Sequence, residues 1–350
     1  MAGKMATIAV KVVIVTILLT IPVIFSDDMA PIPADNLEVT NWFKTNVKPY
    51  EARKDTLDPA LAAAEAKPKV IKVRQDGTGN FKTVTDAVNS IPLGNTRRVI
   101  VWIGPGNYTE KITIDQGKPF VTFYGAPYEN PTLVFSGTAA QYGTVYSATL
   151  SVLSDYFTAI NIVIVNSAPR PDGRTDGAQA VAYRIAGDKS AMYNCQLYGF
   201  QDTLCDESGR HFFKDCYIEG TLHVVAGNTE TMVTAQGKEH NTDDSGYSFV
   251  HCTLTGTDKN NVLGRAWRPF ATVVFAYSVL GDIVTPPGWS DDNQPQIDNT
   301  LFFGEYNNRG PGSNRKGRVK YSKNLSDAEA QPFIRLAYIQ ASSWLLPYGV

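Results

Sequence analysis

Four short segments that resemble one another constrain the fold of this chain more than any other feature. Each places a small residue, Cys or Ser, before a short β-forming run that ends at or near a Gly. They are YNCQLYG (193–199), KDCYIEG (214–220), VHCTLTG (250–256) and AYSVLGD (276–282). A strand-and-turn unit that recurs about every 20–26 residues is the signature of a solenoid. The sequence therefore predicts strands stacked in successive turns of one long body.

The sequence pattern from residue 70 onward is typical of an all-β protein. Short β-branched runs recur and are broken by Gly, Asn, Asp or Pro, among them VIKV, RVIVWI, KITI, FVTFYG, TLVFSG, ATLSVLS and NIVIVNS. Most are continuously apolar, which favours parallel, two-sided burial. A β-sandwich is the alternative, but the Asn-Gly and Asp-Gly hairpin turns that it needs are scarce. We predict an all-β parallel β-helix over 68–350, with short helices at its ends, one of them over 84–91.

The spacing of the cysteines agrees with the repeat in most places but is irregular in one interval. Cys195, Cys216 and Cys252 hold equivalent positions in the repeats, which favours buried free thiols over disulfides, although four cysteines allow three pairings. Cys195 and Cys216 are 21 residues apart, and Cys252 and Ser278 are 26 apart, but the interval from Cys216 to Cys252 is 36. That interval fits neither one turn nor two. Either a long loop intervenes there or part of a turn is missing.

The N-terminus predicts export from the cell. Lys4 and Lys11 precede an uncharged apolar run over 12–25, which ends at Ser26-Asp27-Asp28. This pattern is typical of a signal peptide over 1–25. A signal anchor is the alternative, but the run is shorter than the roughly 20 residues of a spanning helix and Pro22 interrupts it. We expect a secreted, extracellular cell-wall protein with no membrane contact.

A lead-in segment over 26–67 follows, with helices expected at 36–44 and 60–66. The net charge of −2 gives no signature of nucleic-acid binding. Two sequons, at Asn107 and Asn324, could be glycosylated outside the cell.

Three short motifs carry residues suited to chemistry. The run Gly199-Phe-Gln-Asp-Thr-Leu places Gln201 beside Asp202, a second amide lies at Gln179, and Leu263-Gly-Arg-Ala-Trp places Arg265 near Trp267. An arginine beside an aromatic ring suits a sugar that bears a carboxylate. Each motif also has a structural explanation: Asp202 is compatible with an ordinary turn, and Arg265 with a structural ion pair.

Taken together, these motifs resemble the pectin methylesterase family over almost everything from residue 70 to the C-terminus. The matching motifs, in chain order, are Asp76-Gly-Thr-Gly, Gly106-Asn-Tyr-Thr-Glu, Gln179-Ala-Val-Ala, Gly199-Phe-Gln-Asp-Thr-Leu, Met232-Val-Thr-Ala-Gln, Leu263-Gly-Arg-Ala-Trp, Gly288-Trp-Ser and Gly304-Glu-Tyr-Asn with Gly310-Pro-Gly. Any one match is weak, but eight in order are specific. The resemblance implies a right-handed parallel β-helix, no metal and no cofactor. It also implies pectin as the partner, a monomer, and a pectinesterase inhibitor protein as a further candidate partner.

The resemblance also assigns roles to residues. An aspartate of the family attacks the methyl ester of a galacturonate unit to give an acyl-enzyme, and a second aspartate protonates the leaving methoxide and then activates water. By motif, Asp202 matches this general acid/base, Gln179 and Gln201 match the amides that stabilise the oxyanion, and Arg265 matches the arginine that orients the nucleophile. Trp267 and Trp289 match aromatic contacts to the sugar.

The nucleophile itself has no match. The family has Gly-Thr-Val-Asp-Phe-Ile-Phe-Gly, whereas here Gly220-Thr221 is followed by Leu222-His223-Val224. Either His223 replaces the aspartate, or the segment is deleted after Thr221. We favour deletion, since roughly 16 further residues would extend the 36-residue interval to two turns of 26.

We therefore expect a pectin methylesterase that acts in cell-wall modification, with impaired activity in this form. The alternative is a non-catalytic family member that binds pectin or protein partners. A polysaccharide lyase or hydrolase on the same type of solenoid is disfavoured, because the chain lacks an acidic calcium-binding cluster and paired hydrolytic carboxylates.

Overall fold

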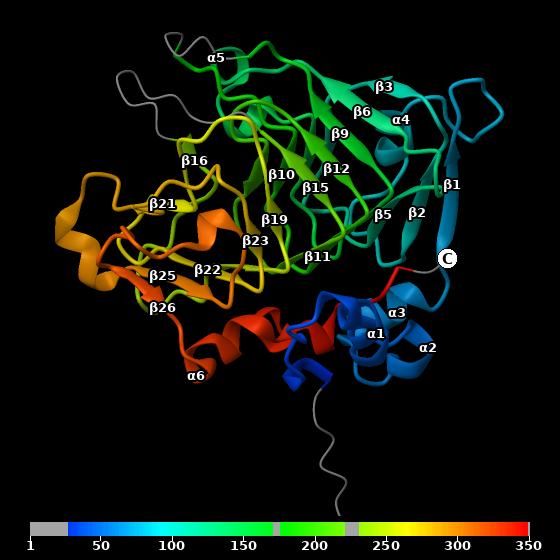
Figure 1. Cartoon of the computed structure of the whole chain (residues 1–350). Helices are drawn as coiled ribbons and strands as arrows, with labels where there is room; N and C mark the ends of the chain where they lie inside the picture. Colours follow the sequence, from blue (N-terminus) through cyan, green and yellow to red (C-terminus); the bar gives the residue numbers. More distant parts are fainter. Residues whose placement is uncertain (1–26, 171–175, 221–230, 349–350) are drawn as a thin grey trace, which may run out of the picture.

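The computed structural model describes residues 27–170, 176–220 and 231–348, and its strands form a parallel β-helix (Figure 1). All pairings between its strands are parallel, which confirms the predicted fold class.

Strands β1–β15 form three sheets, which we call the N-terminal stack. The first sheet contains β1 (Lys69–Val73), β2 (Val99–Ile103), β5 (Val121–Gly125), β8 (Thr158–Ile160), β11 (Ser190–Tyr193) and β14 (His211–Lys214). The second contains β4 (Ile112–Ile114), β7 (Leu150–Val152), β10 (Tyr183–Ile185) and β13 (Leu204–Asp206). The third contains β3 (Asn107–Thr109), β6 (Thr132–Phe135), β9 (Val163–Asn166), β12 (Gln196–Tyr198) and β15 (Tyr217–Glu219).

Strands β16–β26 form a second set of smaller sheets, which we call the C-terminal stack. Its longest sheet contains β18 (Tyr247–Val250), β22 (Thr272–Ala276), β25 (Phe302–Tyr306) and β26 (Ser322–Asn324). The others contain β17 (Ala235–Gln236), β21 (Gly264–Ala266) and β24 (Trp289–Ser290), then β16 (Thr231–Met232) and β20 (Asn261–Val262), then β19 (Thr253–Leu254) and β23 (Val279–Leu280).

Short helices accompany the β-helix; the one that begins at residue 84 covers an end of the core as the sequence predicts, whereas those of the lead-in segment pack against the side of the first sheet. The helices are α1 (Asn36–Asn46), α2 (Tyr50–Arg53), α3 (Pro59–Glu65), α4 (Val84–Asn89), α5 (Ala139–Tyr142) and α6 (Asp327–Ala330). The hydroxyl of Thr83 accepts a hydrogen bond from the Asp86 N–H and caps the N-terminus of α4. The apolar side of α4 belongs to the same buried cluster as the interior of β1, β2 and β4, so α4 covers that end of the core. None of the helices in the described ranges is long and apolar enough to cross a membrane.

The repeats noted in the sequence are corners of successive turns. One residue at each corner has a left-handed backbone, and these residues are Asn161, Asn194, Asp215, His251, Tyr277 and Asn307. Asn and Asp tolerate this conformation best. Asn194 Nδ2 also donates to Asn161 Oδ1 of the preceding turn at 2.8 Å. The next residue points inward: Cys195 is fully buried, and Cys216 packs against the same core. All four cysteines are free thiols, as the sequence favours.

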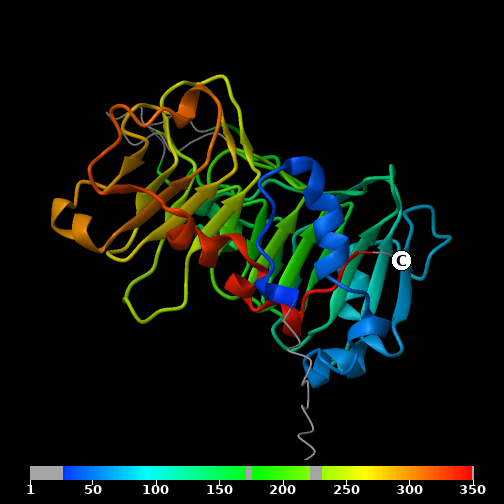
Figure 2. The ribbon, with the colours of Figure 1, turned by 60° about the horizontal axis from the view of Figure 1, so that its bottom comes forward.

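The lead-in segment and the C-terminal tail pack side by side across the first sheet of the N-terminal stack (Figure 2). Phe43 and Leu61 share one buried cluster with Tyr193 and Trp344. The buried Arg53 donates to the Leu345 carbonyl at 2.7 Å, which ties the two segments together.

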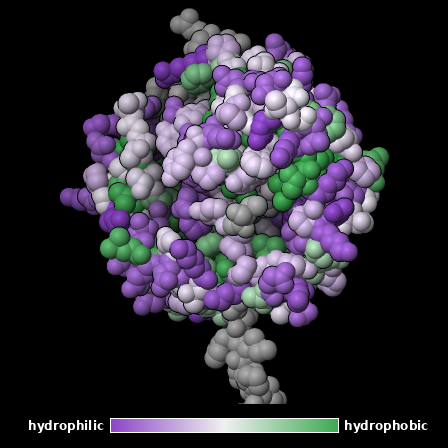
Figure 3. Space-filling view, turned by 90° about the vertical axis from the view of Figure 1, so that its right-hand side faces the viewer, coloured by the Kyte–Doolittle hydropathy of each residue, from purple (hydrophilic) through white to green (hydrophobic). Residues whose placement is uncertain are grey.

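The lead-in touches both stacks. Asp58 accepts a hydrogen bond from Lys189 Nζ in the N-terminal stack at 2.6 Å, and the Pro33 carbonyl lies 2.7 Å from His251 Nε2 in the C-terminal stack. The end of the molecule where the lead-in meets β1 presents a mainly hydrophilic surface with small apolar patches (Figure 3).

Strand pairing is interrupted between the two stacks. Within the described ranges, β13, β14 and β15 end their sheets, and no strand of the C-terminal stack pairs with them. The burial of side chains changes at the same place. Leu133, Ile164 and Leu197 pair in register on successive turns and are fully buried, but Ile218, next in that register, is 47% exposed. An inward position is therefore left half open where the next turn of a continuous solenoid would cover it.

Candidate functional site

The two candidate oxyanion amides lie on neighbouring turns of the N-terminal stack. Gln179 precedes β10 and Gln201 precedes β13, and these two strands are paired. The backbone N–H of Ala180 donates to the Gln201 carbonyl at 3.0 Å, and the Gln179 carbonyl accepts from the Ala139 N–H at 2.8 Å. The Gln201 side chain is buried, whereas Gln179 is half-buried. The structure thus places Gln179 and Gln201 on paired neighbouring turns, and the convergence of their side-chain amides on one groove stays a prediction.

Asp202 projects from the surface beside these amides. It is exposed and has a left-handed backbone with φ of 59°, a conformation that aspartate tolerates. The flanking residues explain the motif: Thr203 is buried and donates to the Glu219 carbonyl at 3.0 Å. A Cβ on Gly199 would lie 3.0 Å from the Thr203 hydroxyl and 3.2 Å from the Ala180 carbonyl, so a larger residue would have to displace one of these neighbours. The corner therefore presents the Asp202 carboxylate outward on a tightly packed base.

Arg265 and Trp267 lie in the C-terminal stack. Arg265 is on β21, between Ala235 of β17 and Ser290 of β24. Its Nη1 lies 2.8 Å from Asp292 Oδ2, and its guanidinium carbon lies 4.9 Å from the centre of the Trp267 ring. The Trp267 side chain is 53% exposed, so the face of the ring turned away from the arginine can be reached by a ligand.

Trp289 lies elsewhere than the resemblance implies. It is 1% exposed, stacks on Phe303 with ring centres 4.6 Å apart, and donates from Nε1 to Glu305 at 3.2 Å. Glu305 is itself buried and paired with Arg315 and Arg318. The expectation that Trp289 contacts sugar is therefore wrong for this structure, because its ring is enclosed in the core beside a buried ion cluster.

The candidate residues thus form two groups. Gln179, Gln201 and Asp202 belong to the N-terminal stack, whereas Arg265 and Trp267 belong to the C-terminal stack. In the described part of the chain Arg265 contacts Asp292 and Trp267, and a direct contact between Asp202 and Arg265 stays a prediction.

The expected position of the nucleophile lies outside the described residues. Thr221, Leu222 and His223 all fall within 221–230. The predicted signal peptide over 1–25 lies outside them as well.

One residue beside the site, Asp292, was not singled out from the sequence, whereas Cys205 was noted there as a position where the family often has Tyr. Asp292, the carboxylate held by Arg265, follows the Gly288-Trp-Ser motif in an acidic doublet, which was the available signal. Cys205 follows Asp202 in the same run. Burial, and then the charges of Glu207 and Asp202, raise the pKa of its thiol to about 11. The Cys205 thiol is therefore protonated at neutral and acidic pH and is a poor nucleophile.

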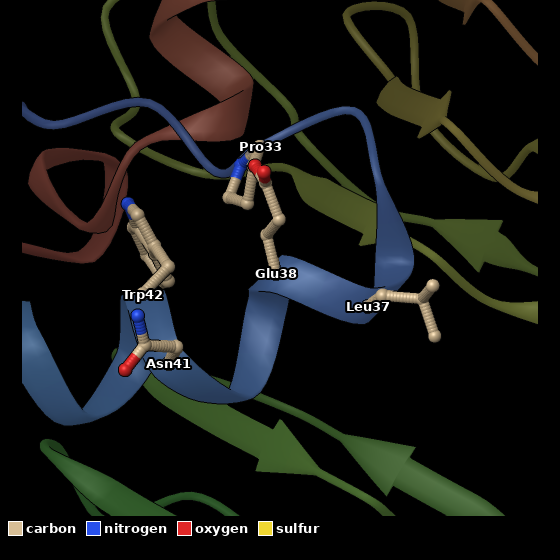
Figure 4. Close-up of a pocket in the computed structure, with 5 residues that line it drawn as sticks. All are labelled: Pro33, Leu37, Glu38, Asn41 and Trp42. Atoms are coloured by element: carbon tan, nitrogen blue, oxygen red, sulfur yellow. The ribbon is translucent and has the colours of Figure 1, made fainter.

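A hollow beside α1 contains none of these residues. It is lined by Pro33, Leu37, Glu38, Asn41 and Trp42, and Figure 4 shows Glu38 extended toward Pro33 while Leu37 points away. Across 27–170, 176–220 and 231–348, no three His, Cys, Asp or Glu side chains are grouped to hold a metal ion.

Comparison with known proteins gives a consistent result. The family model described as Pectinesterase matches residues 70–233 and 228–342, in two parts that meet beside the interruption between the stacks. Pectinesterase 2 of Olea europaea is 51% identical over 360 aligned positions, which cover 98% of each chain. Putative pectinesterase 63 of Arabidopsis thaliana is 47% identical and covers 97% of each chain.

The Olea alignment is longer than this chain. Since 98% of 350 residues is about 343, roughly 17 of its 360 positions have no residue here. Among solved structures, a pectin methylesterase from carrot has a TM-score of 0.73 at 28% identity and covers 81% of this chain and 98% of its own. The pectin methylesterase from Aspergillus niger has a TM-score of 0.66 at 27% identity, over 80% of this chain.

Proposed function

Because this chain belongs to the pectinesterase family, whose members hydrolyse the methyl esters of pectin, we propose that it binds methylated pectin at the Asp202 and Arg265 sites and demethylates it far more slowly than its full-length relatives. The observation that carries this proposal is the juxtaposition of Gln179, Gln201 and Asp202 on neighbouring turns, with no matching nucleophile in the sequence that follows them.

The roles proposed for the first group follow from its geometry. Two amides on adjacent turns can donate hydrogen bonds to the oxygen that becomes negative as the ester carbonyl is attacked. The exposed Asp202 carboxyl beside them can give a proton to the leaving methoxide and then take one from water. In the second group, the exposed Trp267 offers a flat face to a sugar ring.

The missing nucleophile is best explained by a deletion after Thr221. Four observations support it: the 36-residue interval between Cys216 and Cys252, the two-part family match, the roughly 17 unmatched positions of the Olea relative, and the half-open Ile218. The interval and the Olea alignment both indicate a lost segment of a little less than one turn. The family match and Ile218 indicate that it was lost between the two stacks. Replacement of the aspartate by His223 would account for none of them.

The residues described near Asp202 offer poor substitutes. The raised pKa of Cys205 keeps its thiol protonated. His211 is also near this turn, but both of its ring nitrogens are engaged, with Asp206 at 2.7 Å and the Gly187 carbonyl at 2.8 Å. Neither side chain is therefore available as an activated nucleophile.

The same proposal places the protein in the cell wall. The basic and apolar pattern over 1–25 supports export, and the four free thiols do not oppose it, since three of the corner positions are occupied by Cys for packing reasons. N-terminal sequencing of secreted protein tests this point. A mature protein that still contained residues 12–25 would contradict it.

The experiment is methanol release from highly methylated pectin by the purified chain and by a version that carries the relatives' segment after Thr221. We expect the chain as written to be at least about a thousandfold slower, which is the scale of loss when a covalent-catalysis group is removed. Asp202→Asn is the matched variant. It should abolish most of the activity of the restored version but change the chain as written little.

Equal rates from the two versions would show that another residue supplies the nucleophile. Retention of pectin on the chain as written, without methanol release, would favour the second candidate, a non-catalytic binding protein. The exposed Trp267 is the observation that supports this candidate.

A further inference from the structure

Arg265 is already occupied by a carboxylate of its own chain. The ion pair between Arg265 and Asp292 is 2.8 Å long, and the two side chains are only 18% and 34% exposed. Asp292 is fixed as well: its backbone is left-handed, with φ of 58°, and its N–H donates to the Ser290 hydroxyl at 3.2 Å. Ser290 also pairs in register with Arg265, so the backbone that carries Asp292 is fixed next to the strand that carries the arginine.

The surroundings of this pair are acidic. Asp291 neighbours Asp292 in the chain, and burial followed by the charge of Asp291 raises the pKa of Asp298. The next arginine of this segment, Arg268, is paired with Glu239 at 3.1 Å. The two arginines on either side of Trp267 in the sequence therefore each have an acidic partner. Unpaired arginines at these positions would attract the carboxylates of de-esterified pectin.

We propose that Asp292 is a specificity-determining residue, which occupies Arg265 and so makes the surface at Trp267 bind methyl-esterified galacturonate in preference to free galacturonate. This inference rests on the proposed function, because it concerns which form of pectin is held. It adds to that function a residue and a direction of selectivity.

The selectivity follows from the charges of the two ligands. A free galacturonate carboxylate can reach Arg265 only by displacing Asp292, which leaves a fixed, partly buried carboxylate beside the incoming one. A methyl ester carries no charge, so it neither competes with Asp292 nor is repelled by it. Its sugar ring can stack on the exposed face of Trp267, while the guanidinium covers the other face. Product would thus leave more readily than substrate.

The test compares the binding of a galacturonic acid hexamer and of its fully methyl-esterified form to the complete chain. In Asp292→Asn, the free hexamer should bind about tenfold more tightly, the low end of the coupling measured between close charge pairs. The methyl-esterified hexamer should change by less than about twofold, which also shows that the variant is folded. Asp291→Asn is the matched control: it removes the same charge one residue away, and its side chain accepts from the Asn293 N–H rather than from Arg265.

Two results would overturn the inference. One is an equal gain in Asp292→Asn and Asp291→Asn, which would mean that only net charge matters. The other is a gain that survives when Arg265→Gln is added to Asp292→Asn, because the effect would then not act through the arginine. Failure of the methyl-esterified hexamer to bind the unaltered chain would instead remove the proposed function, and the inference with it. Asp292→Ser serves as a second variant should the Asn side chain keep a hydrogen bond to Arg265.

Discussion

The two stacks of this β-helix are built on the same corner but differ in how completely they are buried. In the N-terminal stack, three sheets of four to six strands surround a core in which the ladder from Leu133 to Leu197 is fully buried. In the C-terminal stack, the sheets have two to four strands, and the first strand of its four-stranded sheet, β18, is half-buried throughout whereas β22 and β25 are mostly buried. Exposure is thus greater on β13–β15, which precede residues 221–230 in the chain, and on β18, which follows them.

This difference teaches that each turn of a solenoid depends on its neighbours. A turn contributes its own stability and an interface term on each side, so a turn with one neighbour lost is weakened even if its sequence is unchanged. Leu197 and Ile218 illustrate this, since these two apolar residues occupy the same position in successive turns and only Leu197 is fully buried. Between the stacks, the described contacts include the hydrogen bond of Tyr247 Oη to the Asp206 carbonyl at 3.1 Å and the bridge made by the lead-in segment.

The largest expected effect is on cooperativity of unfolding. Insertion of the relatives' segment after Thr221 should raise the free energy of unfolding by several kcal/mol and merge two transitions into one, because it supplies the missing interface between the stacks. In the chain as written, the C-terminal stack should unfold first. Denaturant titration followed by tryptophan fluorescence measures this, since Trp102 lies in the N-terminal stack and the buried Trp289 in the C-terminal stack.

An insertion of equal length composed of Gly and Ser is the control, because it lengthens the chain without supplying apolar residues for the interface. A single transition in the chain as written, with the same midpoint as the restored version, would contradict the idea that the stacks are weakly coupled.

A smaller effect is expected from truncations within one ladder. Leu197→Ala should lower the free energy of unfolding by about 2–5 kcal/mol, the usual range for a buried leucine. Ile218→Ala should cost about 1 kcal/mol, because nearly half of that side chain is already exposed to solvent. Urea denaturation of the two variants under identical conditions gives the comparison.

The same pair can be measured in the version with the segment restored. There the cost of Ile218→Ala should rise toward that of Leu197→Ala, since a covering turn would bury Ile218. Equal losses of unfolding free energy for the two variants in the chain as written would mean that the turn containing Ile218 is as well packed as its neighbours. The interruption between the stacks would then not lower stability.

The sequence predicted most of the structural features that recur from one turn of the β-helix to the next. The corners at Cys195, Cys216 and Cys252 and the helix over 84–91 followed from local pattern, and the proximity of Gln179 to Gln201 followed from equal phase on successive turns. These features depend on the backbone of one or two neighbouring turns, which the repeat specifies.

The remainder depends on contacts that no repeat encodes. Trp289 was expected at the surface but is buried, because its environment is set by Phe303 and Glu305 on the next turn. Asp292 was missed because its carboxylate reaches Arg265 from a corner 27 residues further along the chain. Such partners are determined by side-chain direction, which the motif alone does not give.

The last prediction concerns His211, which lies on β14 at the interrupted edge and yet has a side chain only 2% exposed. Burial by itself lowers the pKa of the imidazole. The hydrogen bond and charge of Asp206, the Gly187 carbonyl and the charge of Asp188 together outweigh burial and raise the pKa above its usual 6.5. Both ring nitrogens face acceptors, so the doubly protonated ring satisfies both at once.

The sign of the pH dependence follows from linkage. A folded-state pKa above the unfolded value means that the folded protein binds the proton more tightly. The stabilisation is therefore complete below about pH 6.5 and is lost as the pH rises through the higher folded-state value. We expect His211→Gln to lower the free energy of unfolding by about 1–3 kcal/mol at pH 5, the range for hydrogen bonds to charged groups, and by much less at pH 8.5.

Asp206→Asn is the matched variant, because it leaves the histidine in place and removes the carboxylate that favours its charge. It should flatten the dependence of stability on pH between 5 and 8.5 in the same way, and the double variant should flatten it no further. Denaturant midpoints measured across that pH range decide the matter. A loss of stability in His211→Gln that is equal at both ends of the range would mean that His211 acts only by packing, and that the edge of the N-terminal stack contains no titrating ion pair.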